Sequence, residues 1–347
     1  MTENKTHVTE CIDGSLPSPQ ANDKETFFSP QRSSHCSEWS EAITKGLSLK
    51  TILLKHNDEF GFLPLSLVSS PFFGRFLIST PYLNTGGVWA RTDAAALELI
   101  DRACELADKY DVRYLELRHE HPIQHQALSY QRSDKVHMRL ALPSTDELLL
   151  RSYKSKLRSQ IKKCGTHGHV VHWGHADLLD EFYRVFSINM RDLGTPVFPR
   201  RLFAAILKSF GTRAEICVVR NNGTPVASAL LIHNQGITEL PSASSLRAWN
   251  HTGPNMLMYQ RLLERAIEKG SHSFDFGRSS IESGTYRFKK QWGAVASPAP
   301  WQYYVRKGSP TDMRPDSEGK RRLIKTWQKL PVWLTKIIGP PIIRGIP

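Results

Sequence analysis

The chain has 347 residues, of which 40% are hydrophobic and 23% are charged. A chain of that length accommodates two domains with a core each, and its composition is that of a globular protein and excludes a multi-span membrane protein. The formal net charge of +13 favours anionic partners, such as nucleic acid, acidic lipid head groups or a nucleotide-bearing substrate.

The N-terminal residues 1–38 are rich in Ser, Pro, Asn, Thr and charge and lack periodicity, which predicts a disordered leader. The opening MTENKTHVTE has no apolar stretch of the kind a secretory signal needs, and no run in the chain has the length of a transmembrane helix. The five cysteines include no C-x-x-C pair, so reduced thiols in a cytoplasmic protein are expected. Four histidines between residues 167 and 175 lack the accompanying ligand pattern of a metal site, and none is predicted.

A first domain is expected over residues 39–165. Its predicted elements are strands over 48–56, 61–70 and 74–83, a helix over 93–110 and a strand over 112–118. Between two of them, the loop over 81–89 contains a glycine pair that allows close backbone approach, although a plain turn explains it as well.

A second domain is expected over residues 166–310 and repeats that order. A hairpin signal at NNGTP is followed by a predicted helix over 254–270 and a predicted strand over 272–278. The duplicated unit predicts a tandem α+β fold, each domain a mixed β-sheet flanked by helices, and this order of elements is compatible with a GNAT-like (acyl-CoA N-acyltransferase-like) domain. Residues 311–347 are expected to form a basic, amphipathic C-terminal tail.

A strongly basic helix is predicted over residues 144–163. Its segment 151–163 carries six basic residues and no acidic one. Arg158 and Lys162 on this helix are candidates for binding phosphate groups, and a solvated basic face is the alternative. No helix-turn-helix, zinc-finger or aromatic RNA-binding signature accompanies them, so DNA recognition is not expected.

The stretch FDFGRSSIESGTYRFKKQWGA, residues 274–294, contains carboxylates, arginines, a tyrosine and two lysines close together. Side chains of these types take part in catalysis and in substrate binding. Strand alternation directs Phe274 and Phe276 to one face and Asp275 to the other, and Arg278 leaves the strand end. A structural ion pair of Asp275 with Arg278 or Arg247 is the alternative to a catalytic carboxylate.

A short helix is predicted to begin at Ser283, with Tyr286, Lys289 and Lys290 on one side. A lysine on this helix is suited to binding a phosphate group or to stabilising the oxyanion that forms in acyl transfer. The alternatives are solvation of Lys290 and core packing of Trp292.

The segment RAWNHTGPNM meets the N-terminus of the helix over 254–270. Its free amide groups, together with Asn255 and Arg247, predict an anion site. Pro254 is equally a good residue with which to start a helix.

Several strings carry a resemblance to a known family: SPFFGRFLISTPYLNTGGV, KSKLRSQIKKCGTHG, ASSLRAWN, GPNMLMY, FDFGRSSIESGTYRFKKQWGA and WQKLPVWLTKIIGPPIIRGIP. Over residues 45–347 the chain resembles the FemAB family, in the branch associated with exosortase and PEP-CTERM systems. The resemblance implies two GNAT-like domains and an N-acyltransferase that moves an aminoacyl or acyl group to an amine of a peptidoglycan-type, cell-envelope or exopolysaccharide precursor. It also implies that Phe288-Lys289 match the Phe-Lys pair at the family's reaction centre.

The residue pattern, taken together with the resemblance at Phe288-Lys289, suggests roles for the candidate residues. Lys289 would stabilise the oxyanion of the tetrahedral intermediate, and Asp275 would orient or deprotonate the amine. The substrate-binding residues would be Arg278, Tyr286, Phe288, Lys290, Arg247, Asn255, Arg158 and Lys162. The donor would be aminoacyl-tRNA or acyl-CoA without a tightly bound cofactor, and the acceptor a nucleotide- or lipid-linked saccharide.

Two other functions stay open at this point. A CoA-dependent GNAT N-acetyltransferase would need the glycine-rich Q/R-x-x-G-x-G/A loop, which RAWNHTGPNM matches poorly. A non-catalytic accessory protein would bind an anionic saccharide–lipid carrier through the basic patches. The C-terminal tail, with tryptophans and isoleucines among lysines, is expected either to rest on the inner face of the cytoplasmic membrane or to dock onto the protein.

Overall fold

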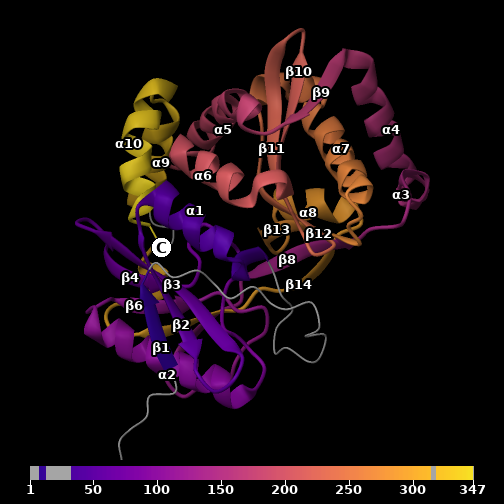
Figure 1. Cartoon of the computed structure of the whole chain (residues 1–347). Coiled ribbons are helices and arrows are strands. Elements are labelled where there is room, and N and C mark those ends of the chain that lie inside the picture. The colour runs from indigo at the N-terminus through magenta and orange to yellow at the C-terminus, as the bar shows by residue number, and fades with distance from the viewer. Residues whose placement is uncertain (1–7, 13–32, 314–317, 347) are drawn as a thin grey trace, which may run out of the picture. The chain divides into compact units, whose positions relative to one another are not determined.

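The structure, a computed structural model, describes residues 8–12, 33–313 and 318–346. Its contacts group the chain into two units (Figure 1). The first comprises Met1–Asp134, Pro298–Arg314 and Pro341–Pro347, and the second comprises Lys135–Ser297 and Pro315–Pro340. Each unit holds a mixed β-sheet flanked by helices, which confirms the predicted tandem α+β arrangement.

The first unit is built on a sheet in the order β1-β2-β3-β4-β6-β15-β7, with β5 paired to β3. Its elements are β1 (Val8–Ile12), α1 (Ser37–Leu47), β2 (Lys50–His56), β3 (Gly61–Ser70), β4 (Gly74–Ile78), β5 (Trp89–Ala90), α2 (Asp93–Lys109), β6 (Tyr114–Leu117), β7 (Tyr130–Arg132) and β15 (Trp301–Val305). Strands β4 and β6 run parallel, and α2 is the crossover that joins them. Thr92 caps α2 by accepting a hydrogen bond from the Ala95 amide, and the buried face of the helix packs on the sheet.

The second unit is built on a sheet in the order β14-β8-β13-β12-β11-β10-β9. Its strands are β8 (Lys135–Ala141), β9 (His169–Gly174), β10 (Ala214–Asn221), β11 (Thr224–Asn234), β12 (Ile237–Ser245), β13 (Ser273–Ser280) and β14 (Val295–Pro298). Its helices are α3 (Asp146–Ser152), α4 (Ser155–Cys164), α5 (Leu179–Leu193), α6 (Arg200–Phe210), α7 (Pro254–Glu268) and α8 (Gly284–Gln291). Strands β12 and β13 are parallel and α7 joins them, so the crossover of the first unit recurs.

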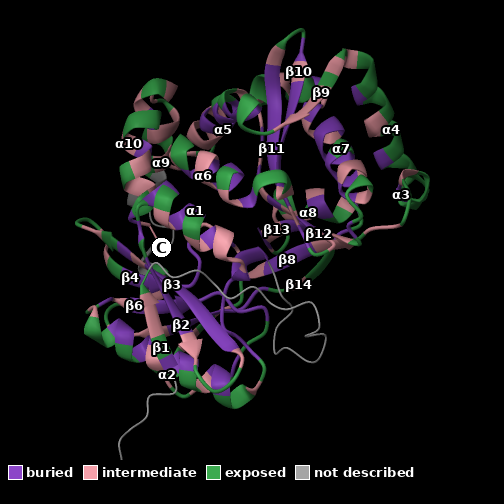
Figure 2. Ribbon diagram, in the orientation of Figure 1, coloured by how far each residue is buried: buried purple, intermediate pink, exposed green. Residues whose placement is uncertain are grey.

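Both faces of this second sheet are covered. Alternate residues of a strand point to opposite faces: Ala229 of β11 lies in the core formed with α3, α4, α7 and α8, whereas Ser228 donates a hydrogen bond to the Phe182 carbonyl of α5. Figure 2 shows the strands mostly buried and the outer faces of the helices exposed. The sheet is therefore fixed rigidly enough to hold side chains at the ends of its strands in place.

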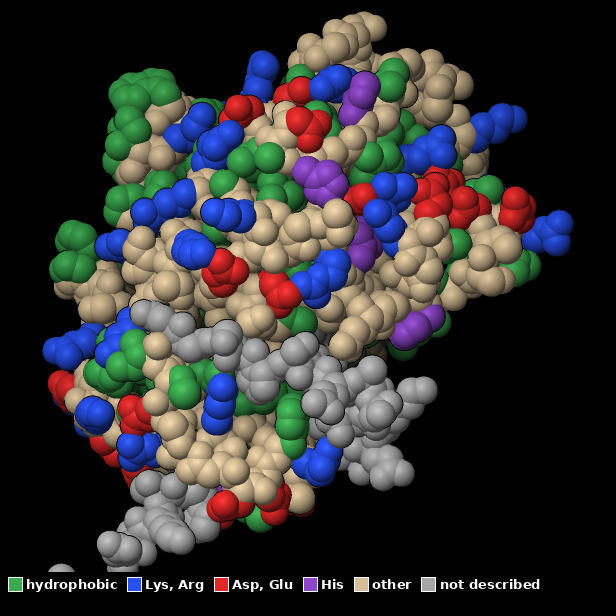
Figure 3. All heavy atoms as spheres, viewed as in Figure 1, with side chains coloured by type: hydrophobic (Ala, Val, Ile, Leu, Met, Phe, Trp, Pro, Cys, Tyr) green, Lys and Arg blue, Asp and Glu red, His purple; other side chains and the backbone are tan. Residues whose placement is uncertain are grey.

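Two helices, α9 (Glu318–Gln328) and α10 (Val332–Arg344), follow within the region predicted as a tail. Helix α9 contacts α5, and Gly339 of α10 lies against the backbone of Val197. Hydrophobic side chains are nevertheless visible on the surface of α10 (Figure 3). The predicted tail is thus helical and lies against the protein with part of its apolar surface exposed.

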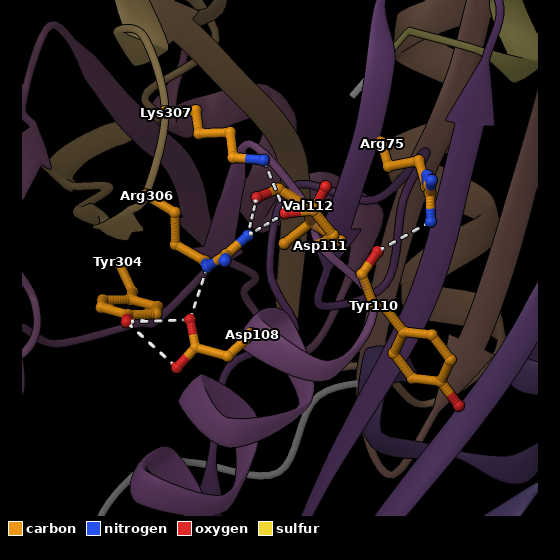
Figure 4. Close-up of polar contacts among 8 residues, drawn as sticks. All are labelled: Arg75, Asp108, Tyr110, Asp111, Val112, Tyr304, Arg306 and Lys307. Atoms are coloured by element: carbon orange, nitrogen blue, oxygen red, sulfur yellow. Dashed lines mark hydrogen bonds and ion pairs between the residues drawn. The ribbon is translucent and has the colours of Figure 1, made fainter.

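Strand β15 returns the chain to the first unit, where it lies between β6 and β7. The return is secured by ion pairs of Arg306 with Asp108 and Asp111, and by Lys307 Nζ at 2.6 Å from Asp111 (Figure 4). The hydroxyl of Tyr304 also bonds Asp108. These contacts attach residues 304–307 to the C-terminal end of α2 and the turn after it.

The observed units and elements differ from the expected limits in four places. Residues 135–165 pack with the second unit, and 298–310 pack with the first, because strand pairing across the chain decides membership. Within the expected disordered leader, residues 8–12 form β1 beside β2; residues 1–7 and 13–32 lie outside the described residues. The single helix predicted over 144–163 is two helices, with Tyr153 in an extended conformation at the break.

Candidate active site

The parallel strands β12 and β13 separate part-way along their length. Their pairing stops after Glu239 and Asp275, whereas β12 continues beside β11 and β13 continues beside β8. The pairing of β13 with β8 shifts register between Asp275 and Arg278, and Gly277 within this bulge has φ of 74°. A bulge bends its strand, and the left-handed conformation at Gly277 is one that glycine adopts without strain. The FDFG sequence thus accounts for the point at which the sheet opens.

Asp275 stabilises the bulge from inside the domain. Its Oδ2 accepts a hydrogen bond from Arg139 Nε at 2.7 Å, and its Oδ1 accepts one from the Gly277 amide at 2.7 Å. Arg139 lies directly opposite on β8. A structural ion pair of Asp275 therefore exists, but its partner is a residue that the sequence pattern did not identify. Because the carboxylate bonds both a neighbouring strand and the bulge, it fixes the direction in which β13 leaves the sheet.

Helix α8 places Lys289 against this bulge. Ser283 caps the helix by accepting a hydrogen bond from the Tyr286 amide at 3.1 Å, as predicted. Lys289 is 8% exposed, and its Nζ donates to the carbonyl oxygens of Gly277 at 3.2 Å and Arg278 at 3.1 Å. Two of the three ammonium hydrogens are occupied by these bonds, which leaves one donor for a further acceptor.

Burial changes the proton affinity of Lys289. Loss of solvation lowers the pKa of its ammonium from 10.5 to about 8, and the charge of Asp275 opposes that change. The group therefore remains mostly protonated near neutral pH, but it releases its proton much more readily than a surface lysine does. Such a group stabilises a developing negative charge in an environment of low dielectric constant.

The neighbours of Lys289 on α8 differ in their environments. Phe288 is half-buried, and its ring packs edge-on against Tyr259 of α7 at a centroid distance of 4.8 Å. Lys290 is exposed, with its Nζ 5.7 Å from the ring centre of Tyr286. The expectation that Tyr286, Lys289 and Lys290 share one side is thus wrong for Lys289, because adjacent helical residues point about 100° apart. Trp292 is 1% exposed and lies in the core.

The first turn of α7 lies beside α8. Gln291 Nε2 lies 3.8 Å from Met256 Sδ, which joins the end of α8 to the start of α7. Asn255 in the same turn is half-buried, and Arg247, in the 3-10 helix Arg247–Thr252 before it, is exposed. The structure thus brings the predicted anion site at the helix N-terminus to the element that carries Lys289.

The end of α4 also approaches the start of α7. A Cβ on Gly253 would lie 2.5 Å from Cys164 Sγ, so glycine is needed for this contact. Arg158 and Lys162 are exposed on α4, and Arg158 Nη1 donates to the Tyr153 carbonyl. Among the described residues no contact links either cation to Lys289. They form a basic surface on a helix that abuts the site, rather than part of its immediate lining.

A pocket of about 450 Å³ lies elsewhere in the second unit, lined by Gly165, His169, Val170, Val171, Trp173, Leu257, Arg261, Glu264, Arg265 and Glu268. Its charged side chains pair with one another, Arg261 with Glu264 and Arg265 with Glu268. None of the candidate site residues lines it. The pocket therefore provides no reactive group for the chemistry at Lys289.

The corresponding strand end of the first unit is filled by its own side chains. Glu116 and Arg118 form a buried ion pair at 2.7 Å, and Arg118 lies over the Trp301 ring at 4.1 Å. Amides of Gly86 and Gly87 donate to the Arg118 carbonyl, so the loop over 81–89 packs onto this strand end. The glycines of that loop serve close packing, which supports the plain structural explanation.

Arg139 is the site residue that sequence reasoning missed. Its position in β8 gives no local signal, because its role depends on pairing with a strand 136 residues later. Within the described ranges no group of three or more His, Cys, Asp or Glu side chains is placed to hold a metal ion. In the same ranges no helix combines the length and apolar composition needed to span a membrane.

Comparison with known proteins supports an acyltransferase domain at this site. Residues 151–290 match a family model described as an acetyltransferase (GNAT) domain. That range contains the α7 N-terminus, the bulge of β13 and Lys289. A search of curated proteins found no match to the sequence.

Solved structures share the fold of most of the chain at low sequence identity. FemX covers 78% of this chain and 91% of its own, with a TM-score of 0.57 and 15% identity. The C-terminal domain of an Agrobacterium fabrum protein provisionally named lysylphosphatidylglycerol synthetase covers 78% of this chain and 88% of its own (TM-score 0.54, 12% identity). L-PGS from Bacillus licheniformis covers 87% of this chain and 92% of its own (TM-score 0.52, 13% identity). These likenesses confirm the tandem GNAT-like fold.

Proposed function

We propose that this chain is an N-acyltransferase of the FemAB type, which transfers an aminoacyl or acyl group to an amine of a cell-envelope or exopolysaccharide precursor. The observation that carries the proposal is the buried ammonium of Lys289 at the point where β12 and β13 separate. Its place within a segment that matches GNAT acetyltransferases supports it. A FemX structure and a protein named lysylphosphatidylglycerol synthetase share the fold, and the latter name describes an aminoacyl group joined to a lipid.

The reaction is nucleophilic substitution at an activated carbonyl. The acceptor amine forms a C–N bond with the donor carbonyl carbon, and the carbonyl oxygen takes up the negative charge in the tetrahedral intermediate. The remaining N–H of Lys289 donates to that oxyanion. Collapse of the intermediate breaks the C–O bond of an ester donor or the C–S bond of a thioester donor. The proton lost by the amine ends on the leaving oxygen or sulfur, so charge and atoms balance.

We assign Asp275 the orienting role. Its carboxylate accepts hydrogen bonds from Arg139 and from the Gly277 amide, so both of its oxygens are engaged in holding the bulge. By holding the bulge it keeps the Gly277 carbonyl in reach of Lys289. The carboxylate then acts through the position of the lysine rather than on the amine.

The donor and acceptor would be held by the cations around the site. Arg278 at the bulge, with Arg247 and Asn255 at the N-terminus of α7, would bind phosphate near the reaction centre. Arg158 and Lys162 on α4 would bind phosphates farther away, which fits a polyanionic donor such as aminoacyl-tRNA. Phe288, Tyr286 and Lys290 would contact the substrate from α8. From the sequence resemblance we place the acceptor, a nucleotide- or lipid-linked saccharide, in an exosortase and PEP-CTERM system.

Acyl-CoA is the second candidate donor, because the family model that matches residues 151–290 is that of acetyltransferases. Both donors present an acyl carbonyl and phosphates, so the same residues serve either. They differ in the bond that breaks and in the number of phosphates.

The proposal is tested by supplying the purified chain with radiolabelled aminoacyl-tRNA or acyl-CoA and amine-bearing saccharide acceptors, and measuring amide product. Lys289→Met should lower turnover at least ~100-fold, the usual scale for removing an oxyanion donor, whereas Lys290→Met should stay near wild type. Arg158→Gln with Lys162→Gln should weaken tRNA use more than CoA use. Binding of a lipid-linked saccharide without amide product from either donor would support the non-catalytic alternative instead.

A further inference from the structure

Helix α10 exposes its apolar side chains and buries its small ones. Thr335 and Gly339 are buried, whereas Trp333 is 65% exposed and Ile337 is 63% exposed. Helical residues four positions apart share one face, so Thr335 and Gly339 define the inner face while Trp333 and Ile337 define an outer one. A surface helix of a globular protein usually has the opposite arrangement, with its apolar stripe toward the core.

Close backbone contact fixes this orientation. A Cβ on Gly339 would lie 2.8 Å from the Val197 amide nitrogen, so glycine alone allows the inner face to approach so closely. Thr335 satisfies its own hydroxyl by donating to the Val332 carbonyl at 2.9 Å. The outward position of the tryptophan and isoleucine therefore follows from how the helix is held.

Helix α9 shows the same feature. Gln328 Nε2 donates to the Asp192 carbonyl at 3.0 Å, and Arg191 Nη1 donates to the Leu330 carbonyl just after the helix at 3.1 Å. Ile324 packs where Gly194 leaves room for it. Leu323, one residue away, is 70% exposed. Helix α9 and residues 332–340 of α10 thus belong to the second unit, while large apolar side chains of both helices are exposed to solvent.

The two helices that expose these apolar side chains are also rich in positive charge. Residues 319–346 contain seven Lys or Arg and no Asp or Glu. Arg322, Lys325 and Lys329 are exposed, and none of them forms an ion pair among the described residues. Figure 3 shows Lys and Arg side chains next to the hydrophobic ones in this region. Exposed tryptophan and aliphatic side chains flanked by cations are the composition of helices that lie in the head-group layer of a membrane.

We infer that α9 and α10 form a surface that binds an anionic lipid bilayer, with Trp333, Ile337 and Leu323 inserted at the head-group level and Arg322, Lys325 and Lys329 facing acidic lipids. A second copy of this chain is the less favourable occupant, because it would bring two all-basic segments together. This surface is separate from Lys289, and the inference does not rest on the proposed reaction. It places the protein where a lipid-linked substrate is found.

Cosedimentation of the full chain with vesicles tests the inference. Binding should be strong to phosphatidylcholine vesicles that contain about one-third phosphatidylglycerol, weak to pure phosphatidylcholine, and reduced by salt. Trp333→Ser with Ile337→Ser should weaken binding at least about tenfold through lost apolar contact. Replacing Arg322, Lys325 and Lys329 by Gln should lower it roughly fivefold for each charge removed.

Matched control variants show whether the loss of vesicle binding is specific to α10 or follows from removing any exposed apolar side chain. Phe72→Ser and Val170→Ser remove exposed apolar side chains elsewhere, 90% and 55% exposed, and should leave vesicle binding unchanged. All of these positions are exposed, so unchanged melting temperatures are expected. The inference is overturned if the Trp333→Ser, Ile337→Ser variant binds vesicles like the wild type, or if the control variants lose binding equally. It is also overturned if the double variant changes the oligomeric state in ultracentrifugation while its vesicle binding persists.

Discussion

Replacing Lys289 by Met should change the pH dependence of stability in a defined direction. Burial holds the pKa of Lys289 at about 8 in the native chain, against 10.5 for a solvated lysine. Between about pH 8 and 10.5 the unfolded chain therefore carries a proton that the native chain has released. Unfolding takes up that proton, so the free energy of unfolding of the wild type rises with pH in this window.

The size of the effect follows from the two pKa values. One pH unit of difference corresponds to about 1.4 kcal/mol, so the native chain gains about 3 kcal/mol between pH 8 and 10.5. Methionine has a similar length and no proton to release, so the Lys289→Met variant lacks this gain. The free energy of unfolding of the wild type should thus be lowest, relative to that of the variant, at neutral pH, where the buried ammonium carries its charge.

The assay is urea unfolding followed by tryptophan fluorescence at several pH values from about 7 to 10.5. The difference in free energy of unfolding between wild type and Lys289→Met should move by about 3 kcal/mol in favour of the wild type as pH rises. Lys290→Met, which removes an exposed lysine, should give a difference that is flat with pH. A flat profile for Lys289→Met as well would refute the buried, partly neutralised lysine and with it the argument for an oxyanion donor.

Two further predictions concern the framework of the site. Arg139→Met should cost about 3–5 kcal/mol in urea unfolding because it leaves the carboxylate of Asp275 buried without its cation, and adding Asp275→Asn should recover part of that loss; additive costs would mean that the two side chains do not interact. Gly253→Ala should lower the melting temperature more than Gly270→Ala, since both glycines have positive φ but only Gly253 would meet Cys164 Sγ; equal losses would contradict the close approach of α4 to α7.

Local patterns in the sequence predicted the crossover units correctly. The apolar spacing of residues 93–110 and 254–270 matches α2 and α7, and the strands predicted after each helix match β6 and β13. These elements are specified by side-chain periodicity and turn residues within a short window. The position of β15 between β6 and β7 was not predictable, because a strand pairs with partners that periodicity does not name.

The candidate site, like the fold, was predictable only where local sequence patterns specify it. Strand alternation and a capping serine predicted the course of residues 274–291, and resemblance singled out Lys289. The burial of Lys289 beside an exposed Lys290 follows from packing of α8 on the sheet, which no local pattern contains. The role of Arg139 depends on the pairing of β8 with β13, which the local sequence pattern does not predict. Residues that act through tertiary contacts are the part that one sequence leaves out.

The location of β15 has a consequence for synthesis on the ribosome. The first unit needs residues 301–305 to fill the space between β6 and β7, and these residues are translated after all seven strands of the second sheet. The usual order, in which the N-terminal domain completes its folding first, is therefore unavailable to this chain. We expect the first unit to wait on the ribosome with one edge of β6 unpaired and β7 without its partner strand. Nascent chains released before residue 301 should therefore be prone to aggregation.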